Sequence, residues 1–190
     1  LALQTACSLR PRTPEISAWL DQAAGGPALL RLAAARDPFP ENYSRLQALF
    51  KDSEPGIRIA ACKANTGAFK NLLVSALGDT HQGVRVTAVK SLRNNPDMNG
   101  TQVIEALLKS FSDSSQQVRQ EAETSMVYLA EKNPAPAREL LKNTLASQDS
   151  LQRLHAMQAL TRLGERSAVP AITAMIPRET TSENLSAGIL

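Results

Sequence analysis

The apolar positions of this chain repeat along the sequence at intervals of about 30 residues. Each unit is marked by an arginine with a leucine twelve residues before it, a leucine or phenylalanine eight residues before it and an alanine three residues after it. The four marker arginines are Arg58, Arg85, Arg119 and Arg153. Each unit also holds two stretches with apolar residues at helical spacing. The pattern predicts stacked pairs of helices, A then B, in an all-α, right-handed α-solenoid of about five helical hairpins.

The clearest unit shows how the helix limits are predicted. Helix A covers residues 102–111, the polar residues 112–115 form the turn, and helix B covers residues 116–131 before Asn133-Pro134 stops it. A glycine, Gly164, is expected to cap the next B helix in the left-handed conformation. The other predicted helices span 13–20, 27–35, 43–50, 55–64, 68–77, 82–93, 135–146, 150–163, 168–176 and 182–190.

These helices predict a single repeat array over residues 1–190. Residues 1–40 form an irregular first repeat, and the last unit is a capping or truncated repeat, because Asn184 stands where the arginine is expected. The intervening boundaries give repeats at 41–64, 65–99, 100–134 and 135–166, followed by 167–190.

The spacing between marker arginines is uneven. Arg85, Arg119 and Arg153 are 34 residues apart, but Arg58 precedes Arg85 by only 27. Either this unit is naturally short or residues are missing between Ala64 and Asn65, and we favour the second explanation. A short period in this half of the chain stays open, because Arg31 also precedes Arg58 by 27 residues.

An aspartate stands six residues before each of the first three marker arginines. A carboxylate at the A–B turn can accept hydrogen bonds from helix B amides and from the arginine, so its repetition predicts a ladder of charge-assisted bonds between units. In particular, Arg119 is expected to satisfy a buried carboxylate. The fourth unit departs, with Asp149 only four residues before Arg153. The predicted structural ladder consists of Asp52, Arg58, Asp79, Arg85, Asp113, Arg119 and Arg153.

This arrangement of aspartate, arginine and alanine resembles the HEAT repeat, most closely the short bacterial-type repeats named after phycobilisome lyase subunits. The resemblance extends well over residues 41–190 and loosely over residues 1–40. It implies a solenoid of helical hairpins with B helices along the inner wall, and it implies an interaction platform with no fixed chemistry.

Composition narrows the classes of partner. The net charge of +3 is small for a phosphate-binding surface, and the single tryptophan, Trp19, falls at an expected core position, so a nucleic-acid partner is not favoured. No apolar run is long enough to span a membrane.

Cys7 and Cys62 are expected to be buried thiols in a reducing compartment, which favours a cytoplasmic location. The chain begins at Leu1 without methionine and is interpreted as a piece of a longer protein.

No catalytic pattern stands out. His81 and His155 are isolated, and neither belongs to a metal-ligand motif, which argues against the HEAT-like iron-dependent hydroxylases. We therefore expect no catalytic residue, no metal and no cofactor, and a non-enzymatic role is favoured without being fixed.

The remaining candidate for a functional site is a surface on the B helices. Positions five, eight and nine after each marker arginine are expected to point away from the packed stripe of helix B and to form a mildly basic contact face for a protein partner. A merely solvated face is the alternative. Other functions left open are an accessory subunit of a bilin-lyase-like enzyme and a nucleic-acid-binding module like the HEAT-like DNA glycosylases. The candidate contact residues are Lys63, Lys90, Arg93, Tyr128, Gln158 and Arg162.

Overall fold

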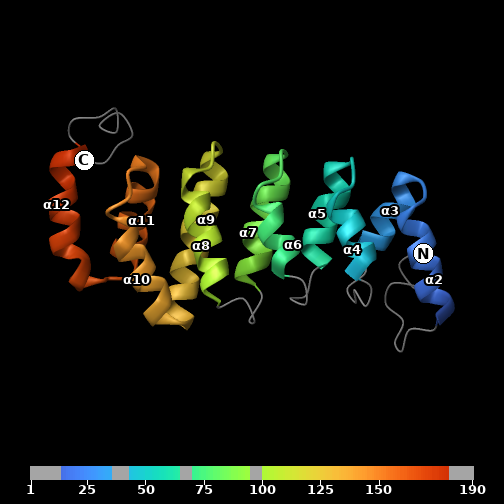
Figure 1. The fold of residues 1–190 in the computed structure, drawn as a ribbon, viewed down its shortest axis with the longest axis horizontal. Helices are drawn as coiled ribbons and strands as arrows, with labels where there is room; N and C mark the ends of the chain where they lie inside the picture. The colour runs from blue at the N-terminus through green and yellow to red at the C-terminus, as the bar shows by residue number, and fades with distance from the viewer. Residues whose placement is uncertain (1–13, 36–42, 65–69, 95–99, 180–190) are drawn as a thin grey trace. The chain divides into compact units, whose positions relative to one another are not determined.

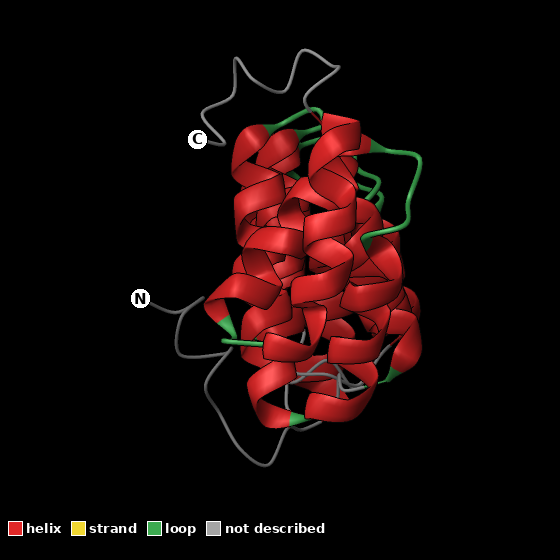
Figure 2. Cartoon of the chain, turned by 90° about the vertical axis from the view of Figure 1, so that its left-hand side faces the viewer, coloured by secondary structure: helices red, strands yellow, loops and turns green. Residues whose placement is uncertain are grey.

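The computed structural model describes residues 14–35, 43–64, 70–94 and 100–179. All regular structure in these residues is helical, and none of them forms a strand (Figure 2). The chain divides into two compact units, Leu1–Met98 and Asn99–Leu190. Each unit is a stack of helical hairpins, so the predicted all-α repeat architecture is confirmed.

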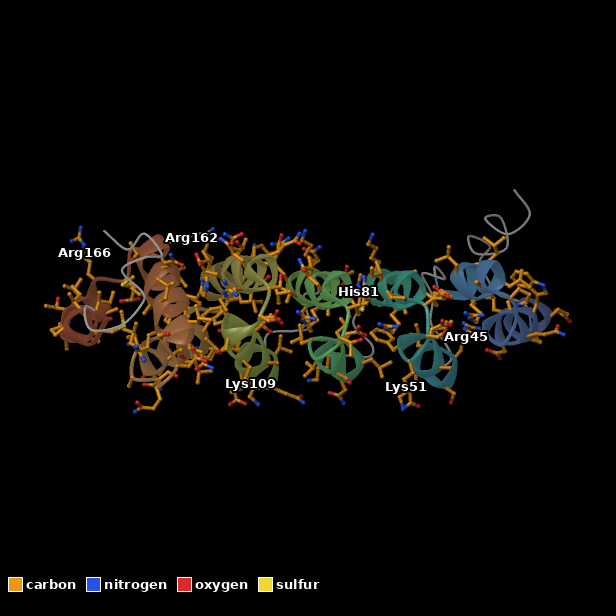
Figure 3. The ribbon with its side chains drawn as sticks, turned by 90° about the horizontal axis from the view of Figure 1, so that it is seen from above. Arg45, Lys51, His81, Lys109, Arg162 and Arg166 are labelled. Carbon is orange, nitrogen blue, oxygen red and sulfur yellow. The ribbon has the colours of Figure 1, made fainter. Side chains whose placement is uncertain are left out.

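The first unit contains three hairpins (Figure 1). In each, the first helix is the A helix and the second is the B helix. The B helices α3, α5 and α7 pack against one another in sequence, while α2, α4 and α6 lie along one side of them (Figure 3). The pairs are α2 (Pro14–Ala24) with α3 (Ala28–Ala35), α4 (Tyr43–Phe50) with α5 (Pro55–Ala64), and α6 (Lys70–Ala76) with α7 (Gln82–Arg93).

The second unit contains two complete hairpins and one further helix. Its B helices, α9 and α11, pack directly against each other. A short 3-10 helix, η2 (Ser110–Ser112), follows α8 and replaces the last turn of the predicted A helix. The elements are α8 (Thr101–Lys109) with α9 (Gln116–Lys132), α10 (Pro134–Thr144) with α11 (Ser150–Arg162), then η3 (Arg166–Ala168) and α12 (Val169–Glu179).

The repeated alanine explains how closely the B helices pack. Ala61, Ala88, Ala122 and Ala156 are all fully buried, and each lies one turn after a marker arginine on a B helix. A methyl group at the crossing lets neighbouring helix backbones approach, and large apolar side chains fill the space between the A and B layers. Fully buried Leu73 and Leu92 fill it in the first unit, and Leu107 and Phe111 in the second.

Polar residues set the helix ends. The imidazole Nδ1 of His81 accepts a hydrogen bond from Gly83 N at the start of α7, and Asp149 accepts from Leu151 N and Gln152 N at the start of α11. Gly164 closes α11 with φ of 62°, and Glu165 N donates to Leu160 O across it. The predicted left-handed cap is therefore present.

Several sequence predictions fall outside the described residues. They include the helix at 182–190, Asn184, Cys7 and the junction after Ala64, where α5 ends next to residues 65–69. Within the described part of the chain, no helix is both long enough and apolar enough to cross a membrane.

Candidate functional site

Each marker arginine holds the A–B turn of its own hairpin. The Nη1 group of Arg58 donates to Asp52 O at 2.7 Å and to Ser53 O at 3.2 Å. The other three arginines bond to the same two turn carbonyls at similar distances: Arg85 to Asp79 O and Thr80 O, Arg119 to Asp113 O and Ser114 O, and Arg153 to Ser147 O and Gln148 O. The arginine thus ties its helix B to the turn that precedes it.

In the first unit, the Nε and Nη2 groups of two of these arginines bind the aspartate carboxylate in the A–B turn of the next hairpin. Arg58 Nε and Nη2 donate to Asp79 at 2.7 and 2.8 Å, and Arg31 makes the same pair of bonds to Asp52 at 2.7 and 3.2 Å. The sequence pattern does not show whether the arginine bonds to the aspartate of its own turn or to that of the next one. In both cases the ion pair joins the arginine of one hairpin to the aspartate 21 residues further along the chain, in the turn of the next hairpin. The hydrogen bonds within a hairpin go instead to backbone carbonyls. We call this arrangement the arginine clamp.

The aspartates of the clamp are held in their charged form. Burial alone would raise the pKa of Asp79, but the hydrogen bonds from Arg58 and from His81 N outweigh it, so the pKa lies below its usual range. The same balance lowers the pKa of Asp52, which Arg31 and Glu54 N bond. Both carboxylates are consequently ionised at neutral pH and bind the guanidinium as bidentate ion pairs.

The clamp is incomplete at Arg119, and here the sequence expectation is wrong. Arg119 was expected to satisfy a buried carboxylate, but its hydrogen bonds go to backbone carbonyls, and its buried Nε has no partner. The reason is the next turn, where Ser147 stands six residues before Arg153 in the place of the aspartate. Asp149 does not replace it, because its carboxylate caps α11.

A groove of about 380 Å³ opens beside the Arg58–Asp79 pair at the turn edge of the first unit. Phe50, Leu72 and Ala76 contribute apolar surface to it, and Lys51 adds an ammonium group. Since its two aspartates are already bound by arginines, the groove presents no acid–base pair suited to catalysis.

A buried polar cluster joins α9 to α11 in the second unit. Glu123 Oε2 lies 3.0 Å from His155 Nδ1, and Arg162 Nη1 donates to Glu123 Oε1 at 3.1 Å. The ring of fully buried Phe111 packs beside His155, with ring centroids 5.7 Å apart. Burial opposes ionisation of Glu123, but the hydrogen bonds from His155 and Arg162 prevail and lower its pKa. The cluster therefore fixes the two B helices to each other.

The predicted contact residues of the second unit are all exposed on its B helices. Tyr128 is 40% exposed, and Gln158 and Arg162 are exposed one turn apart on α11. Arg162 Nη1 lies 3.5 Å from the hydroxyl of Thr124, one turn before Tyr128, which brings the two helices' exposed residues together. The ammonium of Lys132 lies 5.8 Å from the centre of the Tyr128 ring. Figure 3 shows Arg162 on the B-helix side and Lys109 on the A-helix side.

The predicted contact residues of the first unit are less uniform. Lys63 at the end of α5 is exposed, whereas Lys90 and Arg93 on α7 are half-buried. Lys63 and Lys90 occupy the same position in neighbouring B helices, five residues after their arginines. Each unit therefore carries a B-helix patch that includes at least one accessible contact residue.

Two further predictions from the sequence concern the burial of Trp19 and metal binding. Trp19 was expected in the core but is 36% exposed on α2, so that expectation is wrong, whereas Leu20 and Ala23 of this helix are buried. Among the described residues, no group of three histidine, cysteine or acidic side chains is placed to hold a metal ion.

Stacked A–B hairpins with a repeated arginine and alanine define a helical-repeat protein. The family model described as HEAT repeats matches residues 44–127, so this part of the chain is similar to HEAT repeats. A search of the curated proteins found no match.

Two solved structures are similar at low identity. One is an engineered protein from the Northeast Structural Genomics Consortium, with 21% identity, TM-score 0.48, and coverage of 99% of this chain and 90% of that chain. The other is described as computationally designed armadillo repeat proteins for modular peptide recognition, with 20% identity, TM-score 0.43, and coverage of 91% and 90%.

Proposed function

We propose that this chain is a protein-binding scaffold and that its partner contacts the exposed face of the B helices. The proposal is supported by the exposed surface of α9 and α11, two B helices that pack against each other and carry Tyr128, Gln158 and Arg162. HEAT-type stacks present extended surfaces of this kind, and each repeat adds a neighbouring strip to the surface.

The residue types of this patch suit an interface. Tyrosine and arginine are enriched among the residues that dominate binding energy, because each combines apolar area with polar groups. Arg162 is half exposed, although one of its nitrogen atoms is bonded to Glu123. The buried Glu123–His155 contact holds the underlying helices, so the surface is organised before a partner arrives, which lowers the entropic cost of binding.

Charge indicates the kind of partner. Lys63, Lys132 and Arg162 place cationic groups on or beside the B-helix patches, and the chain carries a net charge of +3. A partner segment with acidic residues beside an aromatic or aliphatic side chain would complement the patch around Tyr128.

The closer resemblance to phycobilisome-lyase-type repeats and the cytoplasmic location stay predictions.

Paired substitutions test the proposal. The partner recovered with wild-type protein would be quantified with Tyr128→Ala/Gln158→Ala and with Lys109→Ala/Glu139→Ala, whose sites are exposed on A helices. Arg162 is left unchanged because its loss would also disturb Glu123. We expect at least a tenfold loss of affinity for the first variant and little change for the second. Equal affinities for the two variants would refute binding at the B-helix face.

A further inference from the structure

The groove at the turn edge of the first unit lies between two A helices. Its walls come from the C-terminal ends of α4 and α6 and from the A–B turns that follow them. Phe50 at the end of α4 and Leu72 and Ala76 on α6 provide its apolar surface. Its volume of about 380 Å³ falls in the range of about 300–1,000 Å³ that is usual for ligand pockets. The groove therefore has room for an apolar side chain from outside the chain.

The aromatic ring in this groove is less covered than its equivalent in the second unit. Phe50 and Phe111 each stand eight residues before a marker arginine. Phe111 is fully buried, and the imidazole of His155 from the next hairpin packs beside it. Phe50 is only partly buried, and the residue of the next hairpin at the repeat position of His155 is Thr87. A threonine side chain covers less of a ring than an imidazole does, so Phe50 offers apolar surface to the groove.

The groove also carries one positive charge that its own ion pairs do not neutralise. Asp52 is bound by Arg31, and Asp79 is bound by Arg58. Among the lining residues, the charge outside these two pairs is the ammonium of Lys51, the exposed residue that follows α4. Figure 3 shows Lys51 on the A-helix side of its unit, away from the B-helix face. An acidic group beside an apolar side chain would complement this combination of charge and apolar surface.

The exposure of the lining residues indicates the kind of ligand. Ser75, Gly78 and Thr80 line the groove and are all exposed. Sites for small molecules enclose about 70–90% of the ligand surface, which a groove with so exposed a rim does not do. A peptide needs less enclosure, because one side chain can enter the groove while the peptide backbone stays in water. The hydroxyl groups of Ser75 and Thr80 can then exchange hydrogen bonds with that backbone.

We propose that this groove binds a peptide segment of a second protein, in which a leucine or phenylalanine stands next to an acidic residue. The apolar side chain packs against Phe50 and Leu72, and the acidic side chain pairs with the ammonium of Lys51. This ligand is distinct from the partner at the B-helix face, so the assignment of the groove does not rest on the proposed function.

The whole chain is tested with a panel of capped tetrapeptides that have glycine at both ends. One central residue is leucine, phenylalanine or alanine, and the other is aspartate, asparagine or lysine, in both orders. Backbone amide NMR spectra follow each titration. Peptides that combine leucine or phenylalanine with aspartate should shift the amide signals of Ser75, Gly78 and Thr80 and saturate at a dissociation constant on the order of 1 mM, since one side chain and one ion pair bind weakly.

The panel separates the apolar part of the proposal from the charged part. No saturable shift with any leucine or phenylalanine peptide, or equal affinity for the alanine peptides, would overturn the groove as a binding site. Equal affinity for the aspartate and lysine peptides would overturn the role of Lys51. Phenylacetate serves as a free aromatic carboxylate, and tighter binding of phenylacetate than of every peptide would overturn the assignment to a peptide.

A charge reversal provides the matched variants. In Lys51→Glu the lysine peptides should bind more tightly than the aspartate peptides, with a change of about threefold in each affinity because the pair is exposed. Lys109→Glu, at an exposed lysine of an A helix in the second unit, should leave the preference for aspartate unchanged. Tyr128→Ala should also keep it, so a failure of the proposed B-helix face and a failure of the groove appear in different variants. An unchanged preference in Lys51→Glu, in a chain whose amide spectrum shows it to be folded, would overturn the proposal.

Discussion

Two arginines at equivalent positions, Arg58 and Arg119, should contribute very differently to stability. Arg58→Ala removes the bonds to its own turn and also leaves the Asp79 carboxylate without its guanidinium. Both side chains of this pair are only 11% exposed. Loss of one partner from a buried pair costs about 3–5 kcal/mol, and we expect the lower end because some exposure remains.

Arg119→Ala removes only the bonds to Asp113 O and Ser114 O, because no carboxylate is bound. Hydrogen bonds from a charged donor to a partly exposed carbonyl contribute about 1.5 kcal/mol. With about 3 kcal/mol for Arg58→Ala, the difference between the two variants should therefore be about 1.5 kcal/mol, with Arg58→Ala the less stable. The assignment of the clamp predicts this order although both arginines fit the same sequence pattern.

Native-state hydrogen exchange gives the free energy of opening for each unit separately. The amides of α5 and α7 would report on Arg58→Ala, and those of α9 and α11 on Arg119→Ala, each against the wild type. Asp79→Ala and the double variant Arg58→Ala/Asp79→Ala complete a cycle, in which the double variant should lose less than the sum of the single losses. Equal losses in the two arginine variants, or a greater loss for Arg119→Ala, would refute this account of the clamp.

Three further predictions follow from single side chains. Because the pKa values of Asp79 and Glu123 are lowered in the folded protein, both carboxylates contribute their full stabilisation at neutral pH. This contribution starts to decline near the unfolded pKa values of about 4 and is lost as the pH falls through the folded values. Asp79→Asn should therefore show a smaller drop in urea midpoint between pH 7 and pH 3 than the wild type. Burial raises the pKa of the Cys62 thiol to about 12, so in a Cys7→Ser background a thiol reagent at pH 8 should react slowly until urea is added; fast reaction without urea would contradict its burial. Gly164→Ala should lower stability by about 1 kcal/mol because of its positive φ, whereas Gly56→Ala, in α5 with open space around the added methyl group, should raise the thermal midpoint.

The helices and their layers could be predicted from the sequence because they depend on local spacing. The interval from Arg85 to Ala88 recurs in each of the four units, and its alanine is fully buried in all of them. The direction of the clamp could not be predicted, because an aspartate six residues before one arginine is also 21 residues after another. Only the packed turns show that Arg58 bonds to Asp79 while its Nη1 holds the carbonyl of Asp52.

The polar cluster was missed for a similar reason. Glu123 and His155 are 32 residues apart, and neither position carries the same residue type in the other units, so no repeat signal marked them. The serine at position 147 could have been found by counting six residues back from Arg153. The sequence analysis noted that Asp149 departs from the pattern, and the structure shows that its carboxylate caps α11.

Site-specific photo-crosslinking can show whether the partner contacts the B-helix face. A photoreactive residue would be placed singly at Lys63, Tyr128 or Gln158 on B helices, and at Lys51, Lys109 or Glu139 on the A-helix side; Figure 3 shows Lys51 and Lys109 on that side of their units. If the partner binds this face, it should be captured from the first three positions and hardly at all from the second three. Capture from the A-helix positions at equal or higher yield would contradict it.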